Sequence, residues 1–364
     1  MTTEISMLNN IESPRMTLRL HAMICAQARL ELHRQREALH HRYAISIPRI
    51  STDQVSRNGN RKSLEDAILR TLLYFDIWNH PLTIEELRTF LPLEVRSQAA
   101  LLPAIEHLCA IEVIAQDGRH FSIHHAHRVS QNSRETKERR AFFMWKMARV
   151  ATAFIKMFPY VRAVWVSGEL SKNIASPHAD VDFFIVTEPG RLWITRAMLI
   201  VFKKIFLLNS KKFFCLNSFI DVRNLESCAR NMYQAIEIAS LKPLYNPGLL
   251  RKFFQANAWV WSYFPNFDPN DIALSHTTSR RSVLQRVSEK VFSLIDADAL
   301  EDRLMRTMQA LWRRRYPQID DATRDRILRS TKSESRAFFG DFEEKVLTAY
   351  KRNLHKYHLA GDED

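Results

Sequence analysis

The stretch from Val164 to Val186, VWVSGELSKNIASPHADVDFFIV, decides how this sequence is interpreted. It contains an apolar run typical of a strand, a Ser-Gly turn, a polar loop and a second apolar run. Asp180 and Asp182 are one residue apart in the second run, and alternation along a strand predicts that both lie on one face. Adjacent carboxylates repel each other unless a cation or a proton lies between them. In so apolar a strand the pair predicts a divalent-metal site, the alternative being one aspartate at a strand end and one exposed on an edge.

These residues resemble the signature of the DNA polymerase β-type nucleotidyltransferase superfamily. The shared features are an apolar strand, Gly168, a loop of ten residues after Glu169, and Asp-Val-Asp-Phe from Asp180. The sequence from there to about Tyr245 resembles an uncharacterised bacterial branch of this superfamily. The chain departs from the signature at Glu169, where Ser or Gly is usual.

The resemblance implies transfer of a nucleoside monophosphate from a nucleoside triphosphate to an unidentified acceptor hydroxyl, with Mg²⁺ or Mn²⁺ as the cofactor. Asp180 and Asp182 would hold the metal, and the superfamily usually adds a third carboxylate from a neighbouring strand. Asp221 is expected to be that residue, because it ends the apolar run CLNSFID. Asn217, predicted to share a face with Asp221, could ligate through its carbonyl, and Glu237 is a weaker alternative because it falls in a predicted helix.

The resemblance also implies a triphosphate-binding turn after the first strand. Gly168 would let the backbone approach the phosphates closely. Ser167 and Ser171 would donate hydroxyl groups, and Lys172 would neutralise phosphate charge or remain solvated. Glu169 either repels the triphosphate or turns away from it.

Composition describes an ordinary globular protein that favours polyanionic partners. The chain has 364 residues, 46% of them hydrophobic and 26% charged, with a formal net charge of +13. Such a charge favours nucleic acid, nucleotides or an anionic membrane surface. Four scattered cysteines without C-x-x-C spacing predict free thiols in a reducing cytoplasm. The longest apolar stretch, from Ala197 to Leu208, contains two lysines and is too short to span a bilayer, so we expect no membrane insertion.

The periodicity predicts a helix-rich α+β chain in five segments. Residues 1–62 are expected to be a basic, partly disordered extension, 127–158 a helical connector, and 246–364 a C-terminal helical domain. Residues 159–245 would form a small mixed-sheet nucleotidyltransferase core. Residues 63–126 read as three helices and a hairpin, which resembles a winged helix-turn-helix. Its third helix is mainly apolar, which favours a protein-contact or structural role, with weak nucleic-acid contact as the alternative.

A second interpretation comes from another functional class. The chain could be a non-catalytic regulator that keeps a nucleotidyltransferase fold as a binding module beside a DNA- or protein-binding winged helix. The distinguishing feature is whether Asp180, Asp182 and Asp221 converge within a metal-sized distance.

Overall fold

A computed structural model describes residues 57–125, 134–207, 212–272, 281–294, 296–336 and 342–359. The expectations for residues 1–56 therefore lie outside the described residues. The chain divides into two compact units. The smaller comprises residues up to 84, 96–126 and 351–364, and the larger comprises 85–95 and 127–350.

The smaller unit is built from helices and one hairpin. Helix α2 (Arg57–Asp76) buries Ile68, Leu72 and Phe75, which recur at helical spacing. The turn η2 (Gln98–Leu101) leads directly into α4 (Leu102–Ala110). Strands β1 (Ile114–Asp117) and β2 (His120–Ile123) pair in antiparallel fashion across a turn in which Gly118 has φ +57°. These elements confirm the order of helices and hairpin expected from the sequence. The short helix α3 (Ile84–Thr89) lies at the boundary, and residues 85–95 belong to the larger unit.

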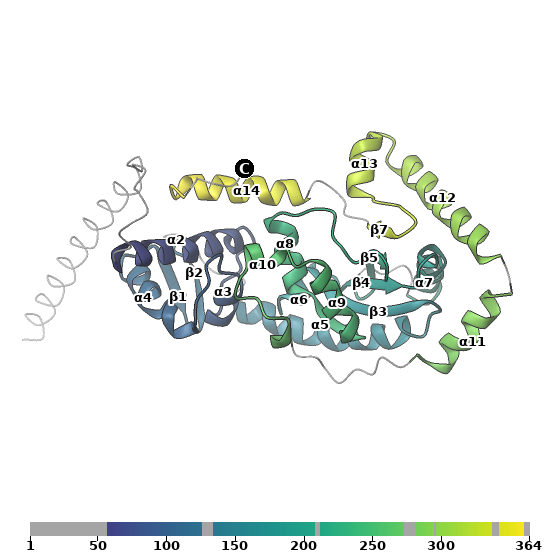
Figure 1. Cartoon of the computed structure of the whole chain (residues 1–364), viewed down its shortest axis with the longest axis horizontal. Helices are drawn as coiled ribbons and strands as arrows, with labels where there is room; N and C mark the ends of the chain where they lie inside the picture. The colour runs from purple at the N-terminus through teal and green to yellow at the C-terminus, as the bar shows by residue number, and fades with distance from the viewer. Residues whose placement is uncertain are drawn as a thin grey trace, which may run out of the picture. The chain divides into compact units, whose positions relative to one another are not determined.

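The larger unit contains a mixed five-stranded sheet in the order β6-β3-β4-β5-β7. Figure 1 labels β3, β4, β5 and β7 of this sheet. Its strands are β3 (Val161–Ser167), β4 (Asp182–Thr187), β5 (Cys215–Asp221), β6 (Lys242–Tyr245) and β7 (Glu334–Arg336). Strands β4 and β5 are parallel, connected by α7 (Leu192–Phe206), and the other pairs are antiparallel. The chain is therefore α+β and helix-rich, as the sequence predicts.

The two faces of this sheet are covered by different helices. On one face Val166, Phe183 and Phe219 join a core formed with the long helix α5 (Arg134–Ile155) and with α7. On the other face Trp165 stacks on Phe184, and both rings contact Phe253 of α9 (Pro247–Ala256). Because side chains alternate along a strand, Asp182 shares the second face with Phe184.

Two strands in this sheet were missed by the sequence interpretation. The sequence analysis gives no strand at β6, where Lys242 and Pro243 pair with Val166 and Trp165. Proline is tolerated there because β6 is an edge strand. Strand β7 has only three residues, two of them charged, so it carries no apolar alternation. The segment 246–364 is therefore not wholly helical.

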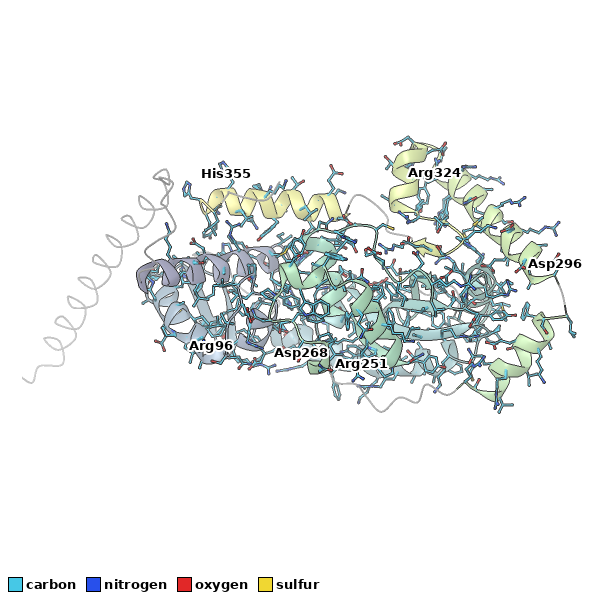
Figure 2. All side chains as sticks on the ribbon, in the orientation of Figure 1. Arg96, Arg251, Asp268, Asp296, Arg324 and His355 are labelled. Carbon is cyan, nitrogen blue, oxygen red and sulfur yellow. The ribbon has the colours of Figure 1, made fainter. Side chains whose placement is uncertain are left out.

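The remaining helices largely follow the expected pattern. They are α6 (Gly168–Ser171), α8 (Met232–Ser240), α10 (Val260–Tyr263), η3 (Pro269–Asp271), α11 (Val283–Phe292), α12 (Ala297–Arg315), α13 (Asp321–Ile327) and α14 (Phe342–Lys356). Asp296, labelled in Figure 2, accepts a hydrogen bond from the Ala299 amide and caps α12. Among the residues that the structure describes, none belongs to a helix long and apolar enough to cross a bilayer.

Candidate metal centre

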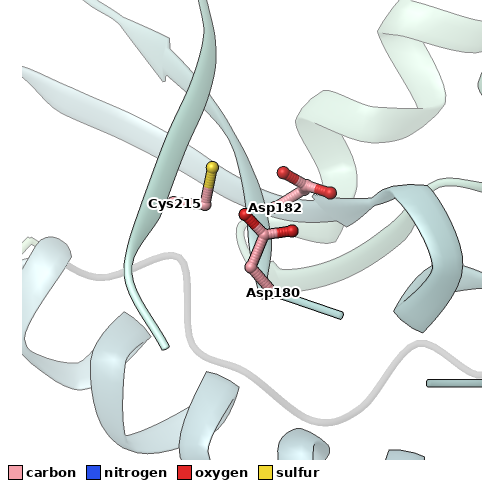
Figure 3. Close-up of side chains that lie close together, drawn as sticks. All are labelled: Asp180, Asp182 and Cys215. Atoms are coloured by element: carbon pink, nitrogen blue, oxygen red, sulfur yellow. The ribbon is translucent and has the colours of Figure 1, made fainter. Parts of the chain in front are cut away.

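Asp180, Asp182 and Cys215 bring their side chains together at one end of the central strands (Figure 3). One carboxylate oxygen from each aspartate and the Cys215 Sγ all lie within 4.8 Å of one another. All three residues are half-buried. The structure therefore brings together the aspartate pair predicted from the sequence and adds a thiol to it.

Backbone pairing explains why these three residues meet. Strand β4 begins at Asp182, so Asp180 precedes the strand, but Val181 already pairs with the neighbouring segment. The Val181 amide donates to the Lys212 carbonyl at 3.0 Å, and the Cys215 amide donates to the Val181 carbonyl at 3.1 Å. In the parallel ladder Asp182 is in register with Cys215, so the first residues of β4 and β5 are neighbours.

Gly168 closes the turn beside this cluster. Its φ is +69°, which L side chains rarely adopt, and a Cβ at this position would lie 2.5 Å from Asp182 Oδ2. The left-handed backbone favours glycine at this position, and the Asp182 carboxylate would have to shift to admit a Cβ. The turn and the carboxylate are therefore in close contact.

The electrostatics of the cluster favour a bound cation or a proton. Burial, and after it the charge of Asp180, raises the pKa of Asp182 to about 7. Glu237 of α8 adds a further negative charge that raises this pKa, while Cys215 and Lys172 lower it. Burial, followed by the two carboxylates, raises the pKa of the Cys215 thiol. A divalent cation would relieve the repulsion that these negative groups impose on one another.

The residues expected to bind triphosphate have other contacts. Ser167, in register with Asp182, is half-buried and makes no side-chain cap bond. The Ser171 hydroxyl donates to the Gly168 carbonyl at 2.8 Å. Lys172 Nζ lies 2.7 Å from Glu237 Oε1 and 3.3 Å from the Gly168 carbonyl. Of the four, only Lys172 carries a charge for a phosphate, and it lies beside the turn.

Glu169 is held within its own loop. Its carboxylate accepts a hydrogen bond from the Ser176 amide at 2.7 Å, and its carbonyl accepts from the Lys172 and Ile174 amides. Among the described residues, its side chain forms no ion pair with Lys172, which pairs with Glu237. The Glu169 side chain instead stabilises the loop that delivers Asp180.

Asp221 and Asn217 do not join the aspartate pair. Asp221 is in register with Thr187 at the opposite end of β4 from Asp182, on the order of 16 Å away at about 3.3 Å per residue. Its carboxylate caps a turn by accepting from the amides of Arg223 and Asn224. Asn217 lies at a register shift between β4 and β5, an irregularity that breaks the alternation expected from the sequence. The assignment of Asp221 as the third ligand is therefore wrong.

Cys215 and Glu237 are the residues that sequence reasoning missed or gave less weight. The sequence does carry a signal for Cys215, because it is the first residue of the run CLNSFID whose last residue was chosen. In a parallel ladder the first residue of β5 lies beside the first residue of β4. Glu237 could not be placed because its approach depends on how α8 packs, which periodicity does not reveal.

Comparison with known proteins adds no assignment. No protein-family model, no curated protein and no solved structure matches this chain. The chemistry of the site therefore follows from its own donor atoms.

The donor set fits a divalent cation but is not the all-oxygen set that Mg²⁺ prefers. Two carboxylates suit Mg²⁺ or Mn²⁺, which are bound by hard oxygen ligands. The thiol of Cys215 suits softer ions such as Zn²⁺. Asp180 and Asp182 would hold Mg²⁺ or Mn²⁺ through oxygen alone, and Cys215 would become a ligand only for a thiophilic ion.

Proposed function

We propose that this chain is a metal-dependent nucleotidyltransferase that transfers a nucleoside monophosphate from a triphosphate to an acceptor hydroxyl. The observation that carries the proposal is the convergence of Asp180 and Asp182 beside the Gly168 turn. This geometry places two adjacent carboxylates beside a strand-to-helix turn, and this supports the proposal.

The residues would divide the work between holding charge and orienting phosphate. Asp180 and Asp182 would hold the cation, which when bound neutralises charge on the triphosphate. Lys172 is beside the Gly168 turn and would exchange its contact with Glu237 for one with a phosphate oxygen. That exchange would free Glu237, the third carboxylate whose charge reaches Asp182, to accept the proton of the acceptor hydroxyl. The acceptor oxygen would then form a bond to the α-phosphorus while the bond to the β-phosphate breaks and pyrophosphate leaves.

The test compares two aspartates that the sequence analysis assigns to one site and that the structure places at opposite ends of β4. Purified chain is incubated with mixed nucleoside triphosphates, Mn²⁺ or Mg²⁺ and a cell extract, and products are identified by mass spectrometry. Asp182→Asn should abolish nucleotide transfer, whereas Asp221→Asn, altered at the far end of the sheet, should retain it. Transfer that persists in Asp182→Asn, or that is absent from the wild-type chain, would contradict the proposal.

A second function is favoured because Asp221 does not converge with Asp180 and Asp182, which is the feature that distinguishes the two interpretations. The β5 residue in register with Asp182 is Cys215, so the neighbouring strand supplies a thiol where the superfamily usually supplies a carboxylate. A binding module without turnover, joined to a winged-helix-like unit, would keep cation and nucleotide binding and need no third carboxylate. Cation-dependent binding of a non-hydrolysable triphosphate without any transfer product would support this alternative.

A further inference from the structure

Helices α5 and α7 expose a continuous apolar surface, called here the α5/α7 face. It consists of seven large side chains, each at least 45% exposed. They are Phe142, Phe143, Val150 and Phe154 of α5, with Val201, Ile205 and Phe206 of α7. A group of this size exceeds the scattered exposed apolar residues that need no explanation.

Ring contacts show that the two helices contribute to one surface. The Phe154 ring of α5 lies 6.1 Å from the Phe202 ring of α7, and Phe202 lies 5.0 Å from Phe206. At the other end of α5, Phe143 lies 6.1 Å from Phe213, which follows α7 in sequence. The exposed side chains therefore form one patch and not two unrelated stripes.

The charges beside this patch are mainly basic, and the acidic residues Glu135 and Glu138 lie only at the start of α5. Lys146 and Arg149 are exposed on α5, and Lys204 and Lys212 are exposed on or just after α7. The sequence from 139 to 155 and the whole of α7 contain no aspartate or glutamate. The Lys146 ammonium lies 4.5 Å from the centre of the Phe142 ring, so cation and apolar surface are adjacent. The patch is thus both apolar and basic.

We propose that the α5/α7 face docks on the surface of an anionic phospholipid membrane. Aromatic and aliphatic side chains partition into the boundary between headgroups and acyl chains, while lysine and arginine bind lipid phosphates. The charge argues against a second copy of this chain, because two basic faces repel each other. The apolar centre argues against duplex nucleic acid, which is contacted mainly through phosphates.

Docking there would leave the candidate metal centre accessible. Helices α5 and α7 pack on the sheet face that carries Phe183 and Phe219, whereas Asp182 lies on the face that carries Phe184. The surface and the centre belong to the same unit and lie on opposite sides of one sheet. Membrane binding is therefore independent of the proposed transfer reaction and can be tested without it.

The experiment is co-sedimentation of the full chain with vesicles. We expect binding to phosphatidylcholine vesicles that contain phosphatidylglycerol, and at least tenfold weaker binding to phosphatidylcholine alone. The double variant Ile205→Ser/Phe206→Ser should bind the anionic vesicles at least tenfold more weakly. Its matched control, Val287→Ser/Val291→Ser, replaces side chains of similar exposure on α11 and should bind as wild type does.

A charge-matched pair tests the electrostatic part. Lys146→Glu/Arg149→Glu should weaken binding by on the order of tenfold or more, because each cation near an anionic surface contributes substantially. Arg313→Glu/Arg314→Glu changes the net charge equally, on α12, and should leave binding unchanged. The proposal would be overturned by equal binding to both vesicle types, or by equal loss of binding in variants and controls. It would also be overturned if Ile205→Ser/Phe206→Ser dissociated a dimer of the chain and left vesicle binding unaltered.

Discussion

Gly168 and Asp182 are in close contact in the candidate site. A Cβ at Gly168 would meet Asp182 Oδ2 at 2.5 Å, whereas a Cβ at Gly190, with a nearly identical φ of +67°, would have no neighbour within 4 Å. The two glycines therefore separate the cost of backbone conformation from the cost of steric overlap. They also lie in the same unit, which makes one a matched control for the other.

Gly168→Ala should accordingly destabilise the chain more than Gly190→Ala. A left-handed backbone costs an alanine about 1–2 kcal/mol, which both variants should show in urea denaturation. Overlap with the carboxylate should add about 1–3 kcal/mol in Gly168→Ala alone. Equal losses in the two variants would mean that Asp182 moves freely away from the turn.

The raised pKa of Asp182 makes stability depend on pH in a specific direction. A folded-state pKa of about 7, above the ordinary value of 3.8, means that the folded protein binds more protons than the unfolded one between those pH values. Without a cation, the free energy of unfolding should therefore fall as pH rises from about 4 to about 7. The cause is burial of the carboxylate beside Asp180.

Asp182→Asn should remove this dependence. At pH 8 with a chelator present, the variant should be more stable than wild type by on the order of 2–4 kcal/mol, and at pH 4 the two should be similar. Added Mn²⁺ should then stabilise wild type and not the variant. Denaturation curves at the two pH values measure the effect, and a difference that is the same at both would contradict it.

Individual residues also show what the sequence could and could not reveal about the site. The aspartate pair and Gly168 were predictable because strand alternation and turn geometry are local. Asp221 was assigned wrongly because its distance from Asp182 depends on the ladder register. That register places the start of β5, not its end, beside the start of β4.

At the scale of elements, α7 depends on a cap from another helix. Glu301 of α12 is buried, and its two carboxylate oxygens accept from the amides of Trp193 at 2.7 Å and Ile194 at 2.9 Å. These amides belong to the first turn of α7, which has no intrahelical partner for them. A carboxylate there also interacts favourably with the helix dipole.

Glu301→Ala should therefore destabilise the larger unit through α7. Loss of the cap, and of partners for buried amides, should cost about 1–3 kcal/mol in denaturant unfolding. The control is Asp298→Ala on the same helix, which removes an exposed ion pair with Arg191 and should change stability by less than about 1 kcal/mol. Similar effects in the two variants would contradict the capping role.

The elements that the sequence predicted well are those with a periodic apolar pattern of sufficient length. Ile68, Leu72 and Phe75 mark α2, and Val346, Tyr350 and Leu354 mark α14; all six are buried. The strands β6 and β7 were missed because each is four residues or fewer and is defined by pairing with a distant strand. Local pattern cannot report such long-range pairing.

At the scale of the whole molecule, the smaller unit is completed by the end of the chain. Residues 351–364 belong to it, although the whole of the larger unit's segment from 127 to 350 precedes them in sequence. Asn353 donates from Nδ2 to the Leu73 carbonyl of α2 at 3.2 Å, and Leu354 is 4% exposed. The sequence interpretation, which treats 63–126 as a self-contained domain, does not include these residues.

Leu354→Ala should therefore loosen α2 while leaving the central sheet protected. Removing a buried leucine side chain costs about 2–5 kcal/mol, and the loss should appear as faster amide exchange in α2 by hydrogen-exchange mass spectrometry. Exchange in β3 and β4 should stay as in wild type because these strands belong to the other unit. Arg352→Ala, an exposed change on the same turn of α14, serves as the control and should alter neither. Unchanged amide exchange in α2 of Leu354→Ala would contradict this prediction. It would show that the packing of Leu354 does not stabilise the smaller unit.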